Sequence, residues 1–235
     1  DEIRSTVFRP SRYKKSKLDL VPPDNGLLLD WVFGYGKSSE AAIVTSNKAY
    51  IARLGSGEIV FPAAAVVVVH DDSRLEQRFF RKHDAEVACV CVHPNGVYVA
   101  SSQFSRRNPV IYIWNSGSAK APLVSPTHAG EPVHKRPKIL NKLRLDRTGG
   151  ASSLDFSLDG NLLLSVSEDM NHTLVIWDWV QGERLVEGKC GPSAIYNARF
   201  NPYQMYIDDP DDPFSKRCYT IGTAGARSTK VWSLK

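Results

Sequence analysis

The sequence predicts an all-β fold built from repeated sheet units, and three observations support this prediction. A run of β-branched residues ends in Trp177-Asp178, and such residues suit a half-buried strand. Weaker copies of this run end in Trp114 and Trp232. In the first two copies a four-residue turn, at 93–96 and at 157–160, leads into a second strand in the same register. A strand that ends in Trp and recurs along a chain is typical of a β-propeller, which has one copy per four-stranded blade.

The spacing predicts about three blades of the WD40 kind within residues 76–235. The expected strands are 87–92, 97–101, 110–114, 151–156, 161–167, 174–177, 195–200, 218–223 and 229–232. The Trp spacings exceed the ~40–45 residues of such repeats, so we expect insertions at 116–150 and 203–214, both as exposed loops. A closed ring takes ~4–8 blades, which predicts an incomplete ring or a fragment.

Two further segments precede the repeats. Residues 1–21 are basic and without periodicity, which suits either a solvated extension or an arm that touches a polyanion. Residues 22–75 are more apolar, and the run 59–70 is predicted to be one strand buried on both sides. Pro62 cannot donate to a sheet, so we expect an edge or a bulge there.

The hydrophobic segment carries a resemblance to a known family. Residues 30–36, then 57–61 and the Ala-Val run after them, resemble the hydrophobic (HELP) motif of the echinoderm microtubule-associated-protein-like (EMAP-like) family. In that family the motif precedes a row of WD repeats, and the similarity continues from His83 to Trp232. The resemblance implies a cytoskeletal binding module that contacts tubulin or microtubules.

The repeats also imply a structural role for particular side chains. WD repeats place a His, a Ser or Thr and a Trp where His83, Ser101 and Trp114 stand, and these form a buried hydrogen-bonded line. A Ser and a His could instead form a nucleophile pair, but the Gly-x-Ser-x-Gly elbow is missing. We therefore expect a non-catalytic protein. The residues assigned to the structural motif are Trp31, Phe33, Tyr35, His83, Ser101, Trp114, Trp177, Asp178 and Trp232.

Alternating residues at two places allow two interpretations each. Trp31, Phe33 and Tyr35 would share one face of a strand, packed into a core or offered to a partner. Cys89, Cys91 and His93 would also share a face, as core residues or as metal ligands. Zinc sites prefer Cys-x₂₋₄-Cys spacing and free Cys is usually buried, which favours the core and no metal.

The first insertion is the candidate partner-binding segment. Its cationic residues are Lys120 and six candidates for partner binding: Lys135, Arg136, Lys138, Lys142, Arg144 and Arg147. They suit either a solvated loop or a contact with an acidic surface, and tubulin is acidic. Aromatic residues do not alternate with these charges, so nucleic acid is not an expected partner. The second insertion holds acidic residues that suit a solvated loop better than a Ca²⁺ site or a contact with a neighbouring basic loop: Asp208, Asp209, Asp211 and Asp212.

Composition and motifs argue against several other classes of protein. The chain has 235 residues, a net charge of +5 and no apolar run near the ~18 residues of a membrane span, so no membrane partner is expected. The first 19 residues lack a signal core, and four scattered cysteines favour a reducing cytosolic setting. Phosphate-binding loops and acid–base pairs are missing, so we expect no cofactor and no small-molecule substrate.

The hypothesis is therefore a cytoplasmic, cytoskeletal module that binds tubulin through its propeller surface and loops. The alternative is a general WD40 scaffold for other proteins, because propellers serve many functions. Heptad repeats are missing, so soluble tubulin is a better expected partner for this chain than the microtubule lattice.

Overall fold

A computed structural model describes residues 29–33, 51–118, 137–145, 149–203 and 219–234. Every regular element in these ranges is a β-strand, as the repeats predict. None of the described residues belongs to a helix that could cross a membrane. The strands all lie in a compact unit formed by residues 32–235, and residues 1–31 form a separate unit. The predicted basic extension 1–21 lies outside the described residues.

The first sheet is formed by the hydrophobic segment together with the residues that follow it. Its antiparallel strands stand in chain order: β1 (Ala52–Arg53), β2 (Ile59–Ala63), β3 (Val66–Asp71) and β4 (Glu76–Phe80). The prediction of a single strand over 59–70 was wrong, because the chain reverses at Ala64 with a φ of 51°. A non-glycine residue rarely adopts a positive φ, so nothing in the apolar run 59–70 indicated that the chain would turn at this position.

Pro62 lies where the first sheet can accept it. It pairs with Val67 on β3, but β1 reaches only Ile59 and Val60 of β2. At Pro62 the strand therefore has a neighbour on one side only, which is the edge position that a residue without an N–H requires.

The next two sheets each contain four antiparallel strands in chain order. The second sheet consists of β5 (Val87–Val92), β6 (Tyr98–Gln103), β7 (Val110–Asn115) and β8 (Lys138–Arg144). The third consists of β9 (Ala151–Phe156), β10 (Leu162–Ser167), β11 (Thr173–Asp178) and β12 (Glu183–Lys189). The expected loop over 116–150 was therefore wrong for 138–144, which form the outer strand of a sheet.

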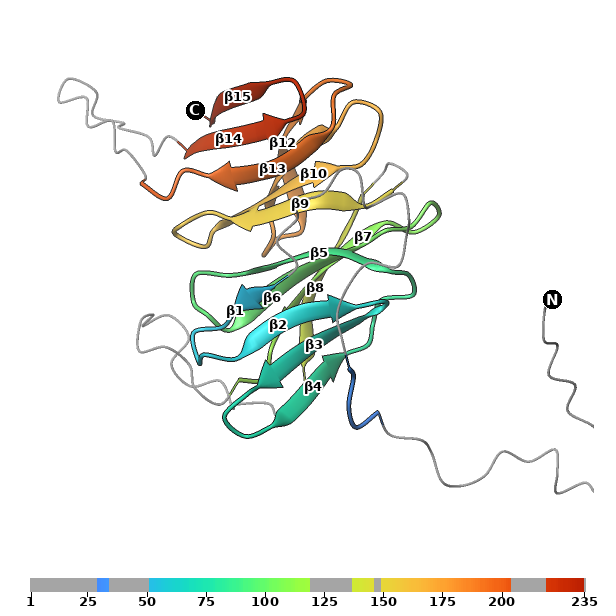
Figure 1. The fold of residues 1–235 in the computed structure, drawn as a ribbon. Helices are drawn as coiled ribbons and strands as arrows, with labels where there is room; N and C mark the ends of the chain where they lie inside the picture. The colour runs from blue at the N-terminus through green and yellow to red at the C-terminus, as the bar shows by residue number, and fades with distance from the viewer. Residues whose placement is uncertain (1–28, 34–50, 119–136, 146–148, 204–218, 235) are drawn as a thin grey trace, which may run out of the picture. The chain divides into compact units, whose positions relative to one another are not determined.

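The fourth sheet has three strands in the described part of the chain. They are β13 (Ile195–Phe200), β14 (Tyr219–Gly225) and β15 (Thr229–Leu234). The four sheets stand one behind another, with β5 beside β9 and β9 beside β13 (Figure 1). Within the described ranges they do not close a ring, in agreement with the predicted incomplete propeller.

Three apolar clusters fill the spaces between successive sheets. The first joins Val60, Val67 and Phe80 to the second sheet, where Phe80 stacks on Trp114 with ring centroids 4.5 Å apart. The second cluster joins the second and third sheets, and the third joins the third and fourth. Each sheet is therefore stabilised mainly by its neighbours, as expected of a stacked repeat protein.

Candidate interaction surface

A buried hydrogen-bonded line crosses the second sheet. The indole N–H of Trp114 donates to Oγ of Ser101 over 3.0 Å. The Ser101 hydroxyl then donates its own proton to Nε2 of His83, 2.8 Å away. Trp114 and Ser101 have no exposed surface, and His83 is 7% exposed. The structure thus brings the three side chains into one chain of donors and acceptors, and all three are occupied by structural contacts.

Three residues that sequence analysis did not single out extend this line. Nδ1 of His83 faces Oε1 of Gln103 at 3.0 Å, and the Gln103 amide donates to Asp84 and to the carbonyl oxygen of Asn108. The amide oxygen of Gln103 can only accept, so Nδ1 of His83 carries the proton, and Nε2 of the neutral ring accepts from Ser101. Burial lowers the pKa of His83 from 6.5 to about 4, so the ring stays neutral at physiological pH.

The tryptophans of the other repeats make the same contact, and no histidine joins them among the described contacts. Trp177 donates to Oγ of Ser165 over 2.8 Å, and Trp232 donates to Oγ1 of Thr223 over 3.0 Å. The carboxylate of Asp178 accepts the backbone N–H groups of residues 180 and 181, each at 3.0 Å. The Trp-Asp pair therefore ties two strands together and caps the turn that follows.

The alternating residues 89–93 contribute to packing and hydrogen bonding. The thiols of Cys89 and Cys91 are buried, and burial raises the pKa of Cys91. His93 contacts the carbonyl oxygen of Gly160 at 3.0 Å through Nε2, while its Nδ1 accepts the N–H of Asn95. Among the described residues no three His, Cys, Asp or Glu side chains are grouped as a metal site.

The aromatic residues 31–35 differ from the expectation of a packed strand. Residues 29–33 form no strand, and Phe33 is 88% exposed. The backbone N–H of Val32 donates to the side-chain oxygen of Gln77, and the side-chain N–H of Gln77 donates to the Val32 carbonyl oxygen. The Gln77 side chain thus forms the two hydrogen bonds that a neighbouring strand would form. The prediction that Phe33 packs into a core was therefore wrong, and Tyr35 lies outside the described residues.

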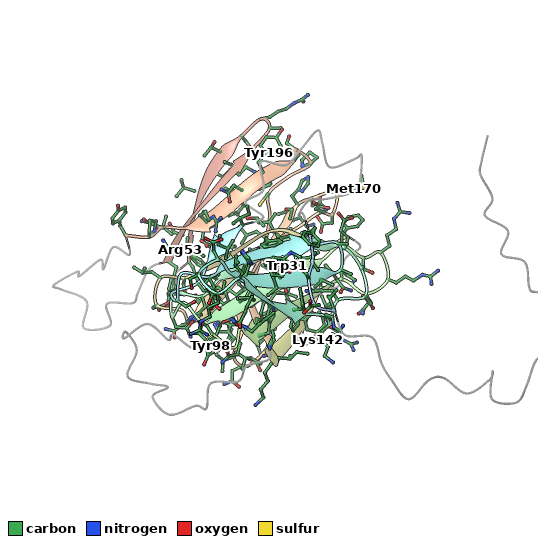
Figure 2. The ribbon with its side chains drawn as sticks, turned by 60° about the horizontal axis from the view of Figure 1, so that its bottom comes forward. Trp31, Arg53, Tyr98, Lys142, Met170 and Tyr196 are labelled. Carbon is green, nitrogen blue, oxygen red and sulfur yellow. The ribbon has the colours of Figure 1, made fainter. Side chains whose placement is uncertain are left out.

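Strand β8 carries the described part of the predicted basic segment. Lys138, Lys142 and Arg144 are all exposed on it, and Figure 2 labels Lys142. Nζ of Lys142 lies 5.3 Å from the ring centroid of Tyr112, which positions the lysine over the outer part of the sheet. Lys135, Arg136 and Arg147 lie outside the described residues, as do Asp208, Asp209, Asp211 and Asp212.

Comparisons with known proteins agree with this architecture. The family described as WD domain, G-beta repeat, matches residues 74–115 and 140–178, which contain most strands of the second and third sheets. Echinoderm microtubule-associated protein-like 2 of Rattus norvegicus is 30% identical over 221 residues, or 91% of this chain. Over most of its length this chain is therefore similar to an EMAP-like protein, and two of its segments match WD repeats.

Two further members of the EMAP-like group show similar identity. Echinoderm microtubule-associated protein-like 3 of Homo sapiens is 31% identical over 84% of this chain. Echinoderm microtubule-associated protein-like 1 of Rattus norvegicus is 28% identical over 79% of this chain. This chain spans 28% of the length of echinoderm microtubule-associated protein-like 2 and 21% of the length of each of the other two relatives. The sequence therefore corresponds to only part of each of these relatives.

The fold itself has a counterpart among solved structures. The crystal structure of the Cps50 (Swd1) β-propeller domain of Myceliophteria thermophila aligns with a TM-score of 0.57. The alignment covers 79% of this chain and 50% of that propeller domain, at 13% identity. This similarity supports the propeller architecture, and at such identity it carries no further information on function.

Proposed function

We propose that this chain is a non-catalytic cytoskeletal binding module that contacts tubulin through the basic outer part of its second sheet. The observation that supports the proposal is strand β8, whose exposed lysines and arginine form no ion pair with any described residue. A relative named for association with microtubules matches 91% of the chain. Exposed cations on a rigid strand favour an acidic protein partner, since they attract it and orient it.

The hydrogen-bonded line supports the non-catalytic part of this proposal. His83 and Ser101 would be the natural base and nucleophile, but Ser101 is fully buried and the Nδ1 and Nε2 atoms of His83 both have partners. A hydroxyl in this position cannot reach a substrate without breaking the sheet. We assign it to the framework that supports the binding surface, in a cytoplasmic protein of the cytoskeleton.

The experiment is co-elution of the chain with purified tubulin dimers on size-exclusion chromatography, at low and at moderate salt. The test variant is Lys138→Glu/Lys142→Glu. We expect the wild type to co-elute at low salt, with less complex at moderate salt because salt screens exposed charges. We expect the variant to lose most of the complex at both salt concentrations.

A matched control separates local charge from net charge. Arg53 is exposed on β1 and Arg74 lies in the β3–β4 turn, and Arg53→Glu/Arg74→Glu changes the net charge by the same amount. Equal loss in both variants would mean that only net charge matters. A folded wild type without any co-elution would contradict the tubulin proposal and favour a scaffold for other proteins.

A further inference from the structure

Three segments far apart in the sequence meet at one end of the second sheet. The stretch before β5 contacts the β6–β7 turn, because Asn108 donates to Oδ2 of Asp84 over 3.3 Å and the N–H of Phe104 donates to the carbonyl oxygen of Glu86 over 2.7 Å. The residue after β8 joins the same turn through a 3.0 Å hydrogen bond from the N–H of Leu145 to the carbonyl oxygen of Pro109.

These segments bring together six exposed cationic side chains, which we call the basic end of the second sheet. They are Arg81, Lys82, Arg106, Arg107, Lys142 and Arg144. None of the six forms an ion pair with a described residue. Only Lys142 and Arg144 belong to the segment already proposed to bind tubulin, so the other four extend that surface over two more loops.

The carboxylates nearby leave this charge largely uncompensated. Asp84 lies within the basic end, but its oxygens accept hydrogen bonds from the amides of Gln103 and Asn108. The hydrogen bonds from Gln103 and Asn108 lower the pKa of Asp84 most, and the charge of Lys142 adds to the effect, so Asp84 stays ionised. Glu86 and Glu168 are half-buried neighbours, so the described part of this region has three carboxylates beside six cations.

The turn that carries two of the cations also carries an apolar residue. Phe104 is 38% exposed, and its backbone is fixed by the hydrogen bond to Glu86. An added Cβ at Gly150 would come within 3.1 Å of the Phe104 Cα, so the second and third sheets are in close contact at this point. A partly exposed aromatic residue in the same turn as Arg106 and Arg107 suits a ligand that has carboxylates and one apolar side chain.

We propose that the basic end of the second sheet binds an extended, glutamate-rich segment of a protein partner. Carboxylates of the segment contact Arg106, Arg107 and Lys142, and an apolar side chain packs on Phe104. Carboxylates interspersed among the cations suit a peptide with separated charges better than a continuous polyphosphate chain. This inference rests on the proposed function in one respect, namely that tubulin is the acidic partner that supplies the segment.

The experiment measures binding of a fluorescent peptide to the full chain by anisotropy at two salt concentrations. The probe is a glutamate-rich 12-residue peptide with one central Phe, and the reference peptide has Gln in place of every Glu. The test variant is Arg106→Glu/Arg107→Glu, and a second variant, Lys82→Glu, changes a different loop. The control, Arg53→Glu/Arg74→Glu, alters charges at the opposite end of the strands, and Figure 2 labels Arg53.

We expect the wild type to bind the Glu peptide and not the Gln peptide, with weaker binding at higher salt. Arg106→Glu/Arg107→Glu should weaken binding roughly tenfold, because two attractions become two repulsions, and Lys82→Glu should weaken it about threefold. The control should change it less than about twofold. Circular dichroism confirms that each variant is folded.

Tubulin binding by the same variants separates this inference from the proposed function. Peptide binding that depends on Arg106 and Arg107, without any tubulin binding, would support the basic end and contradict the tubulin proposal. If the test variant bound both tubulin and the peptide as well as the wild type does, the inference about the basic end would be contradicted and the tubulin proposal would stand. A single-stranded RNA that bound more tightly than the peptide, and lost affinity in the same variant, would also overturn this inference.

Discussion

The hydroxyl of Ser101 lies 3.0 Å from Nε1 of Trp114 and 2.8 Å from Nε2 of His83, so one buried oxygen serves two partners. In the third sheet, Ser165 is equally buried but contacts Trp177 alone in the described contacts. The second sheet is thereby tied to the segment that precedes β5, in addition to its own strands. This is the segment that contributes Arg81 and Lys82 to the basic end.

Replacing Ser101 by Ala should cost about 2–4 kcal/mol of the free energy of unfolding, because the indole of Trp114 and the ring of His83 each lose a buried partner. Replacing Ser165 by Ala leaves one donor without a partner and should cost about 1–2 kcal/mol. Urea denaturation followed by tryptophan fluorescence measures both. Equal costs would show that the contact with His83 adds nothing to stability.

Stability should also depend on pH through His83. Its pKa is about 4 in the folded protein and near 6.5 in the unfolded chain, because burial disfavours the charged ring. Below pH 6.5 the unfolded state therefore binds the proton more strongly, and stability falls as the pH decreases towards 4. Between pH 7 and pH 5 the loss should be about 2 kcal/mol, measured by urea denaturation at each pH.

The variant His83→Gln is the control for this pH dependence, because it cannot titrate in this range. It should be less stable than the wild type at pH 7 and should lose less stability between pH 7 and pH 5. Asp155 opposes the effect, since burial raises its pKa in spite of Arg199, but it is present in both proteins. A parallel decline in both proteins would exclude His83 as the cause.

The reactivity of Cys91 should report on global unfolding. Burial raises the pKa of its thiol, and only the thiolate reacts with alkylating agents. At pH 8 we expect modification of Cys91 to be at least about 100-fold slower in the folded protein than in urea, as measured by mass spectrometry of peptides. Rapid modification of the folded protein would mean that β5 opens locally.

Much of the fold could be predicted because the inner strands follow simple rules. Strands such as β6, β7 and β11 are almost fully buried, so their sequences are runs of mainly apolar and small residues. In β7 and β11 the run also leads into a Trp. The outer strands could not be recognised in this way. In β8 and β12 most side chains are exposed, so these strands have no recognisable pattern of apolar residues. Pairing with a buried strand, β7 for β8 and β11 for β12, stabilises them.

The candidate site was predictable in part for a related reason. His83, Ser101 and Trp114 follow a repeat pattern, whereas Gln103 joins them only because β6 continues two residues beyond Ser101 and points its amide to the same side. Arg106 and Arg107 form part of the basic end only through the contacts of their turn with Asp84 and Leu145. Such tertiary contacts leave no local sequence signal.

The contact between the second and third sheets at Gly160 provides the last prediction. Gly160 has a φ of 77°, and its carbonyl oxygen accepts hydrogen bonds from Nε2 of His93 over 3.0 Å and from Nε1 of Trp179 over 2.7 Å. An added Cβ would lie 2.3 Å from Nε2 of His93, which is too close for any packing. Gly160→Ala should therefore move His93 and cost about 3 kcal/mol or more.

Gly191→Ala is the matched control for backbone strain. Gly191 has a φ of 107°, but its added Cβ would meet nothing closer than the Lys230 ammonium nitrogen at 3.9 Å. This variant should lose only the roughly 1–2 kcal/mol of a side chain in the left-handed region. Thermal and urea unfolding of both variants give the difference, which measures the contact of His93 with Gly160. If both variants lose the same free energy of unfolding, backbone strain alone explains both losses. The contact of His93 with Gly160 would then not contribute to joining the two sheets.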